Sequence, residues 1–170
     1  YYNTKHNTSV AVLGWDSTKP DAGTFVNNFD STDDGRRMAE SFMQEGADVI
    51  LPVAGGVGQG SAAVCKETGK CVVIGVDADW YFTDDANKEV YLTSVLKKVD
   101  VAVYSSAKDA AEGKFTGGTV TYTLKDGGVD IAPFHDFDSQ ISAELKAELE
   151  AIRTGIIDGT INISAILGIP

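Results

Sequence analysis

The sequence has few of the side chains that usually hold metal ions or carry redox chemistry. It contains two histidines, His6 and His135, and two cysteines, Cys65 and Cys71. Two thiols cannot complete a tetrahedral zinc site, and both histidines lie far from them in the sequence. The spacing of the cysteines also differs from the CxxC pattern of redox enzymes. We therefore expect no metal and no redox centre, while a disulfide and two free thiols both stay open.

Positive charge and long apolar runs are also scarce. The chain has 14 Lys and Arg against 25 Asp and Glu, a net charge of -11. A phosphate backbone demands Lys and Arg, so the composition argues against nucleic acid and against an anionic membrane surface as partners. No apolar run approaches the roughly 20 residues that a membrane-spanning helix needs. Because the chain opens with Tyr1 and lacks an initiator Met, we expect it to be processed or cut from a longer protein.

Helical patterns alternate with short apolar runs along the 170 residues, a length typical of one domain. Continuous apolar runs are typical of strands in a parallel sheet that is buried on both faces. The sequence therefore predicts an α/β fold of three layers, with a mainly parallel sheet between helices. The predicted strands are residues 10–13, 48–53, 71–76, 90–96, 119–124 and, more weakly, 129–132, and the predicted helices are residues 35–45, a segment through 62–64, residues 100–114 and a last helix that starts near Ser142.

Glycines follow the second predicted strand at its carboxyl end, the edge where open α/β sheets bind ligands. The segment reads Gly55-Gly56-Val57-Gly58-Gln59-Gly60. Such glycines let a ligand approach the backbone, and free N–H groups at the start of the next helix attract polar groups. Alternatively, the segment is only a tight turn with close packing. Its spacing matches neither the dinucleotide fingerprint nor a P-loop, so we expect no nucleotide cofactor and no other cofactor.

Three further side chains are candidates for binding a ligand. Asp77 ends the third strand, and its carboxylate can accept two hydrogen bonds from a vicinal diol such as ribose, unless it only caps a helix or turn. Lys97 ends the next strand and can donate to a sugar hydroxyl or pair with Asp77, unless it is an ordinary surface lysine. Phe29 lies in a long polar loop, where it can stack on a planar base or pin the loop to the core.

The sequence carries weaker signals for catalysis. Ser94 and His135 lie on separate elements, without the nucleophile-elbow motif of hydrolases. Asp77 and Asp79 lie two residues apart at one strand end, whereas the paired carboxylates of glycosidases normally come from different elements. We therefore expect a binding protein rather than an enzyme.

Four segments carry motifs that together extend over much of the chain. Residues 29–35 read FDSTDDG, residues 46–58 read GADVILPVAGGVG, residues 74–79 read IGVDAD and residues 93–100 read TSVLKKVD. In this order they resemble the signatures of the basic membrane protein family, and residues 132–134 and the closing amphipathic helix also fit. Members of this family are substrate-binding lipoproteins of ABC transporters, and purine nucleoside receptors are the best-known examples.

The resemblance implies a type I periplasmic-binding-protein fold, in which two α/β lobes clamp a ligand. Because family members are considerably longer, residues 1–170 are expected to form a single C-terminal lobe, with about 114–133 belonging to the other lobe or the hinge. The implied ligand is a purine nucleoside: guanosine, adenosine or inosine. By the same resemblance, Phe29 stacks on the base, Gly55 and Gly56 lie against the ligand, and Asp77 and Lys97 bind the ribose hydroxyls.

The resemblance also implies a partner and a location. The partner is an ABC permease, and the location is the extracellular face of the cell membrane, with a lipid anchor in the full-length protein, or the periplasm. Such a setting favours a disulfide between Cys65 and Cys71. An isolated lobe exposes a face that can pair with a second copy, so we also expect a homodimer. Two other functions stay open: an enzyme acting on nucleosides or sugars on a similar scaffold, and a ligand-sensing regulatory domain.

Overall fold

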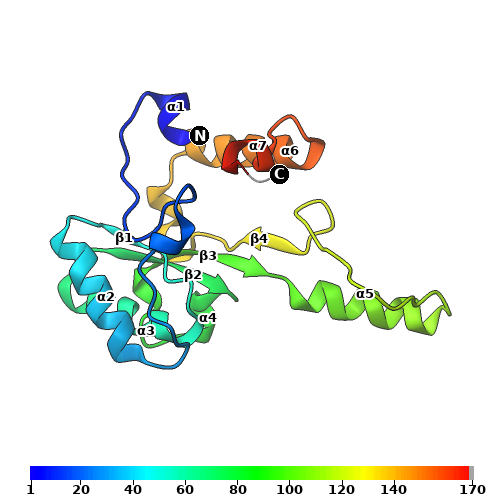
Figure 1. The fold of residues 1–170 in the computed structure, drawn as a ribbon, viewed down its shortest axis with the longest axis horizontal. Helices are drawn as coiled ribbons and strands as arrows, with labels where there is room; N and C mark the ends of the chain where they lie inside the picture. Colours follow the sequence, from blue (N-terminus) through cyan, green and yellow to red (C-terminus); the bar gives the residue numbers. More distant parts are fainter. Residues whose placement is uncertain (169–170) are drawn as a thin grey trace.

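A sheet of four strands organises the computed structural model, which describes residues 1–168 (Figure 1). The first three strands are parallel, and the fourth runs antiparallel to the third. The predicted α/β fold with a mainly parallel sheet is therefore confirmed. Across the sheet the strands are, in order, β1 (Val49–Ile50), β2 (Val72–Asp77), β3 (Tyr91–Lys97) and β4 (Val129–Ile131).

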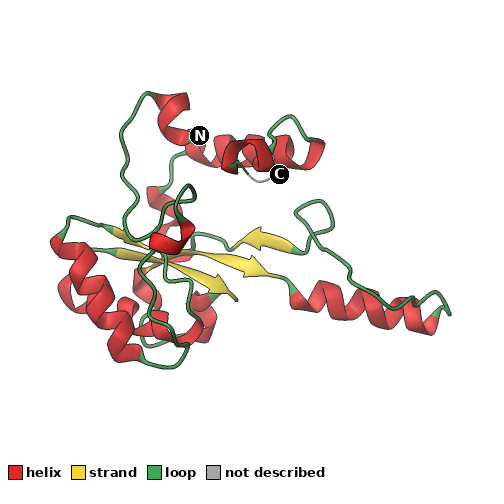
Figure 2. Ribbon diagram, viewed as in Figure 1, coloured by secondary structure: helices red, strands yellow, loops and turns green. Residues whose placement is uncertain are grey.

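Helices lie on both sides of this sheet (Figure 2). α2, α3 and α4 lie on one side, and α1, α6 and α7 lie on the other. The α-helices are α1 (Tyr2–His6), α2 (Thr32–Gln44), α3 (Gly58–Thr68), α4 (Trp80–Thr83), α5 (Val99–Ala111), α6 (Ala143–Asp158) and α7 (Ile163–Leu167), and the short 3-10 helices are η1 (Pro20–Ala22), η2 (Gly55–Val57), η3 (Lys88–Val90) and η4 (His135–Gln140).

The helix boundaries follow from capping residues in the sequence. α2 begins after Ser31, whose side chain accepts a hydrogen bond from the Asp34 N–H, and α6 begins in the same way after Ser142. Serine is favoured at this position because its oxygen satisfies an otherwise unpaired N–H of the first turn. α3 ends at Gly69, which adopts the left-handed conformation that terminates many helices.

α2 and α3 pack so closely that their contact requires glycine. A Cβ on Gly60 would lie 1.8 Å from the Thr32 carbonyl oxygen, and a Cβ on Gly35 would lie 1.9 Å from the Val57 carbonyl oxygen. Both distances are far below van der Waals contact, so any side chain would push the two backbones apart. The close approach of these helices therefore depends on glycine at positions 35 and 60.

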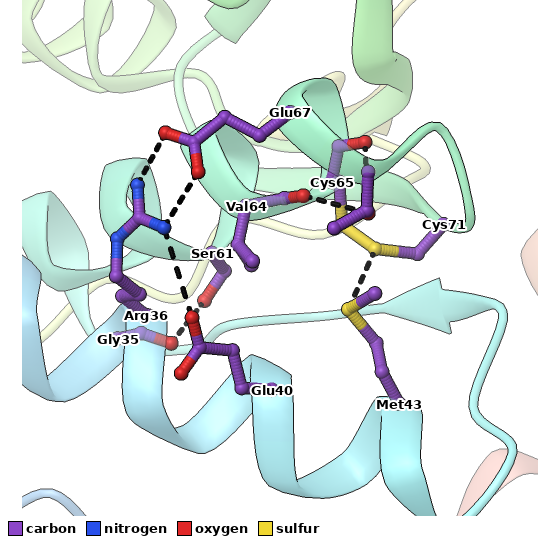
Figure 3. Close-up of polar contacts among 10 residues, drawn as sticks. Gly35, Arg36, Glu40, Met43, Ser61, Val64, Cys65, Glu67 and Cys71 are labelled. Atoms are coloured by element: carbon purple, nitrogen blue, oxygen red, sulfur yellow. Dashed lines mark hydrogen bonds and ion pairs between the residues drawn. A yellow bond between two sulfur atoms is a disulfide. The ribbon is translucent and has the colours of Figure 1, made fainter.

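A disulfide between Cys65 and Cys71 lies inside the core that α2 and α3 form with the sheet (Figure 3). Their side chains are 0% and 7% exposed. The Cys71 Sγ lies 3.3 Å from the Met43 Sδ of α2, a packing contact because a disulfide sulfur carries no proton. The bond joins the end of α3 to the start of β2 and so limits how far these elements separate in the unfolded chain.

Salt bridges hold the helices on the other side of the sheet. Lys5 and His6 of α1 both contact Glu148 of α6, at 2.8 Å and 2.7 Å. Hydrogen bonds from Lys5 and His6 hold the pKa of Glu148 below its usual range. Arg153 of α6 pairs with Asp130 of β4 at 3.2 Å. These contacts connect the first and last parts of the chain to each other and to the edge of the sheet.

The sheet is covered less completely on this second side. Side chains alternate along a strand, so Val49 points away from the buried Ile50, and it is 45% exposed. Val95 and its partner on β4, Ile131, are 44% and 45% exposed. The expectation that helices bury both faces is therefore met on the α2–α3 side and only partly on the other.

One part of the chain projects away from the body (Figure 1). It consists of α5 and the segment that follows it, residues 99–121, which we call the arm. None of its residues is buried, and Val103 and Tyr104 of α5 are 63% and 70% exposed. α5 matches the predicted helix, but no face of it packs into a core.

Two predicted strands, residues 10–13 and 119–124, are wrong. Neither segment pairs with the sheet, and Val12 is 78% exposed. The side chain of Asn3 binds both the N–H and the C=O of Val10, which takes the place of a neighbouring strand. Residues 119–124 lead into a local turn closed by the bond from Gly128 N–H to the Thr123 carbonyl. An apolar run becomes a strand only where a partner satisfies its backbone groups.

Candidate ligand-binding site

Asp77 and Lys97 meet at the carboxyl edge of the sheet. β2 and β3 are parallel neighbours that end side by side, with Asp77 opposite Leu96. The Lys97 Nζ lies 2.7 Å from the Asp77 Oδ1. Both side chains are more than half exposed, so the pair contributes little to stability. It does present an acceptor and a donor to solvent at the edge where ligands bind in such sheets.

Asp77 adopts an unusual backbone conformation. Its φ is 66°, and the Ala78 N–H donates across it to the Val76 carbonyl oxygen at 2.8 Å. A bond that spans one residue with positive φ defines the rare form of the γ-turn. Non-glycine residues in this region carry strain of about 1–3 kcal/mol, and such strain concentrates at ligand sites. The turn places the Asp77 carboxylate beside Lys97.

An open depression of about 410 Å³ lies over this pair. Its volume falls within the range of small-molecule sites, roughly 300–1,000 Å³. One wall is the end of β2 and the other is the junction of β3 with the arm. The lining residues are Asp77, Ala78, Asp79, Leu96, Lys97, Lys98, Val99 and Asp100.

Phe29 lies against the glycine turn that follows β1. A Cβ added to Gly55 would lie 3.8 Å from the Phe29 Cδ1. A Cβ added to Gly56 would lie 3.5 Å from the Phe29 carbonyl oxygen. The ring is 72% exposed, so it is not pinned to the core. Gly55 has a φ of 54°, a conformation that glycine adopts without strain. Phe29, Gly55 and Gly56 thus form an open aromatic and backbone surface.

Asn28 holds the loop that carries Phe29, a role that the sequence analysis missed. Its Oδ1 accepts hydrogen bonds from the N–H groups of Asp30 and Ser31, and its Nδ2 donates to Asp34 at 2.8 Å. Hydrogen bonds from Ser31 and Asn28 hold the pKa of Asp34 below its usual range. The available signal was an Asn shortly before a predicted helix start, because Asn side chains commonly close local turns.

Gly58 and Gly60 serve packing rather than ligand approach. A Cβ on Gly58 would lie 2.5 Å from the Trp80 ring, and Gly60 faces the backbone of α2. The same indole lies 2.7 Å from the position of a Cβ on Gly75 in β2. Trp80 therefore joins the glycine turn to the strand that ends at Asp77. In the sequence, a glycine inside an apolar run, Gly75, was the feature that could have predicted this close approach.

The side chains considered for catalysis, Ser94 and His135, have separate hydrogen-bond partners. Ser94 is fully buried, and its Oγ accepts a hydrogen bond from the Trp80 N–H at 3.1 Å. The His135 ring bonds to Asp79 at 2.8 Å. Within residues 1–168, no cluster of three or more His, Cys, Asp or Glu side chains is placed to hold a metal ion. The described helices also include none that is long and apolar enough to cross a membrane.

The fold places the chain in a class of proteins. A solved structure described as an ABC transporter system solute-binding protein from Aeropyrum pernix K1 superposes with a TM-score of 0.74 and 26% identity. The match covers 95% of this chain and 50% of that chain. The architecture is therefore that of ABC transporter solute-binding proteins, the periplasmic-binding-protein class.

The sequence places it in a family within that class. The family described as ABC transporter substrate-binding protein PnrA-like, abbreviated Bmp, matches residues 23–166. The chain belongs to this family.

Curated relatives support the assignment and set its extent. The "ABC transporter nucleoside-binding protein BmpA" of Lactococcus lactis is 34% identical over 89% of this chain and 47% of its own length. The "CD4+ T-cell-stimulating antigen" of Listeria monocytogenes is 35% identical over 82% of this chain and 42% of its own length. Relatives from three Pyrococcus species carry the word lipoprotein in their names. The matches span 42% and 47% of the Listeria and Lactococcus relatives and 26–31% of the Pyrococcus relatives, so the chain covers half of their length or less.

Proposed function

We propose that the chain forms one wall of a cleft that binds a purine nucleoside for uptake by an ABC transporter. The observation that carries this proposal is the exposed Asp77–Lys97 pair at the carboxyl edge of the sheet, beneath an open depression. A carboxylate and an ammonium side by side can accept from and donate to the vicinal hydroxyls of ribose. The name of the Lactococcus relative, a nucleoside-binding protein, supports the ligand class.

Each candidate residue has a role in this proposal. Asp77 and Lys97 bind the ribose hydroxyls, and Phe29 stacks on the base through its exposed ring. Gly55 and Gly56 let the ligand approach the backbone of the turn. Binding of this kind uses stacking and hydrogen bonds and needs no catalytic group or cofactor. We expect guanosine, adenosine and inosine to bind and to be released unchanged.

The second wall of the cleft belongs to a second lobe in the full-length protein. We infer that residues 1–170 form one lobe and that the arm reaches into the other, together with the turn that follows it up to residue 128. Val103, Tyr104 and Phe115 of the arm are each more than 60% exposed, and apolar side chains at this density usually pack against a partner. Residues 129–131 pair with β3, and for this reason we place the end of the proposed crossing before β4, rather than at residue 133.

Lobe closure over the nucleoside would signal occupancy to a permease. The lipoprotein names of the Pyrococcus relatives support a lipid-anchored protein at the extracellular face of the cell membrane. The disulfide between Cys65 and Cys71 fits an oxidising location of this kind. In the absence of the second lobe, we expect the exposed arm to favour a homodimer, which light scattering at increasing protein concentration would detect.

The test is a titration of the 170-residue chain and of the full-length protein with guanosine, adenosine, inosine and ribose, followed by NMR and calorimetry. Asp77→Ala and Lys97→Ala are each expected to weaken nucleoside binding by about 1–3 kcal/mol, because each leaves a polar partner unsatisfied. Asp85→Ala and Lys88→Ala serve as matched controls, since this exposed pair has a similar distance of 2.8 Å and lies outside the depression. Nucleoside binding that survives both site variants unchanged would contradict the proposal.

A further inference from the structure

His135 is not part of the proposed binding pair, but it lies close to the γ-turn that carries Asp77. The His135 Nε2 is 2.8 Å from the Asp79 Oδ2, and the two side chains are only 12% and 20% exposed. The imidazole ring stacks on Tyr81, with centroids 4.0 Å apart and planes at 11°, and it meets the edge of Phe82 at 5.1 Å. The ring is thus held by the stacked Tyr81, by the edge-to-face contact with Phe82 and by the contact of one nitrogen with Asp79.

Asp79 connects this histidine to the γ-turn. Its Oδ1 accepts from the Tyr81 N–H at 3.2 Å and so caps α4, while its Oδ2 contacts His135. Only Ala78 separates Asp79 from Asp77, and the Ala78 N–H is the group that closes the turn. A displacement of Asp79 would therefore act directly on the backbone that aims the Asp77 carboxylate.

The segment that carries His135 is itself anchored on β3. The Ala132 N–H donates to the Ser94 carbonyl at 2.8 Å, and the Thr93 hydroxyl donates to the Ala132 carbonyl at 2.7 Å. His135 has a φ of 44°, which few non-glycine residues adopt. Such a conformation persists where the surrounding contacts determine it. The backbone of His135 is therefore fixed by its neighbours, and the His135 ring holds the Asp79 side chain in place.

We propose that His135 is a positioning residue for the binding pair: through Asp79 it fixes the turn at Asp77 so that this carboxylate meets Lys97. The role of the turn as part of a nucleoside site rests on the proposed function. The coupling from His135 to the turn rests on the contacts alone, and the two parts can be tested separately.

The ring contacts two titratable groups, Asp79 and Tyr81, and the Tyr81 hydroxyl in turn donates to Asp136 of η4 at 3.0 Å. The hydrogen bond to Asp136 raises the pKa of Tyr81. The nearby Asp85 also raises this pKa, whereas Lys88 lowers it. Tyr81 therefore stays neutral near pH 7 and remains a hydrogen-bond donor to Asp136.

The first test is amide exchange in the 170-residue chain, without ligand. His135→Phe keeps an aromatic ring between Tyr81 and Phe82 and removes the Nε2. We expect the Ala78 amide to exchange at least tenfold faster in this variant, while the amide of Val73 in the core stays protected. His135→Gln, which restores a donor, is expected to recover part of the protection. Unchanged exchange at Ala78 in His135→Phe would overturn the proposal.

A matched control is available in the same chain. His6 also contacts a carboxylate, that of Glu148, at 2.7 Å, but it lies between α1 and α6. His6→Phe is expected to leave Ala78 exchange unchanged. If His135→Phe does not fold, Asp79→Asn gives the same readouts, because it removes the charge that the ring faces.

A nucleoside titration then separates the two proposals. In protein that binds nucleoside, His135→Phe is expected to raise the Kd about tenfold, and His6→Phe is expected to leave it unchanged. If no nucleoside binds the full-length protein but Ala78 exchange responds to His135→Phe, the proposed function fails and the positioning role stands. If Asp77→Ala weakens binding but His135→Phe changes neither exchange nor Kd, the positioning role fails and the proposed function stands.

Discussion

α3 and α5 are helices of similar length, 11 and 13 residues, but they differ in what surrounds them. α3 is buried along much of its length against α2 and the sheet, and a disulfide closes its end onto β2. α5 has no buried residue and projects from the body. Isolated helices of this length are marginal in water, and within residues 1–168 no element buries a residue of α5.

The comparison shows that α3 and α5, although both are helices, have different places in the fold. The α2–α3 layer supports the loop of Phe29, the glycine turn and the strand of Asp77, so its contacts are internal. The arm begins two residues after Lys97 and lines the depression only with its first residues, Val99 and Asp100. A packed body and an arm that projects from it agree with the proposal that a second lobe encloses the ligand.

The largest expected difference between the two regions comes from adding one methyl group to each. In Gly60→Ala the new Cβ overlaps the Thr32 carbonyl, so α2 and α3 must separate, at a cost of about 3 kcal/mol. Gly117→Ala in the arm meets no atom within 4 Å and is expected to change stability by less than about 0.5 kcal/mol. Urea denaturation measures both. Equal urea midpoints for the two variants would contradict the difference in packing between α3 and the arm.

A smaller difference is expected for two tyrosine hydroxyls. Tyr91 is 1% exposed and its hydroxyl donates to Asp84, and burial raises its pKa. Tyr91→Phe leaves Asp84 without this donor and is expected to cost about 1–2 kcal/mol. Tyr104→Phe in the arm is the matched control, because that side chain is 70% exposed. Thermal denaturation compares the two, and a Tyr104→Phe effect as large as that of Tyr91→Phe would contradict the assignment of the arm as unpacked.

The smallest effect is expected from an ion pair between α2 and α3. The hydrogen bonds from Arg36 hold the pKa of Glu67 below its usual value of 4.5 (Figure 3). A lowered pKa means that the contribution is present above about pH 4.5 and is lost as pH falls through the lower folded-state value. Glu67→Gln should therefore lower the melting temperature slightly at pH 7 and leave it unchanged near pH 3.

The arm again supplies the control for this ion pair. Glu112 pairs with Lys114 at 2.7 Å, next to the exposed end of α5. Glu112→Gln is expected to leave the melting temperature unchanged at both pH values, because this pair joins no packed elements. A Glu67→Gln difference that persists near pH 3 would show that the effect does not come from the carboxylate charge.

Much of the fold follows from local sequence patterns. The apolar runs around Val49, Val73 and Val95 became the three parallel strands, because helices separate them and parallel strands require such crossovers. Pairing with Asp77 was one of the alternatives for Lys97, because the two residues end successive strands, and in the structure they form an ion pair. The site role of these residues and of Phe29, Gly55 and Gly56 stays a prediction.

Other features depended on contacts between distant segments. The apolar run that includes Val10 and Val12 reads as a strand but has no neighbour to pair with. The glycine segment looked uniform, yet Gly58 makes room for Trp80 and Gly60 for the backbone of Thr32. No periodicity in the sequence indicates which distant side chain will fill the space that a glycine leaves.

The sequence by itself determined the three parallel strands β1, β2 and β3, the capping residues that start α2 and α6, and the polar ends of β2 and β3. These are local properties, decided by side-chain size, branching and hydrogen-bonding groups within a few residues. Only the tertiary structure decided that Asn28 holds the Phe29 loop, that His135 reaches Asp79 across 56 positions, and that α5 is left without a core. Such contacts depend on which segments meet in space, and that follows from packing the whole chain at once.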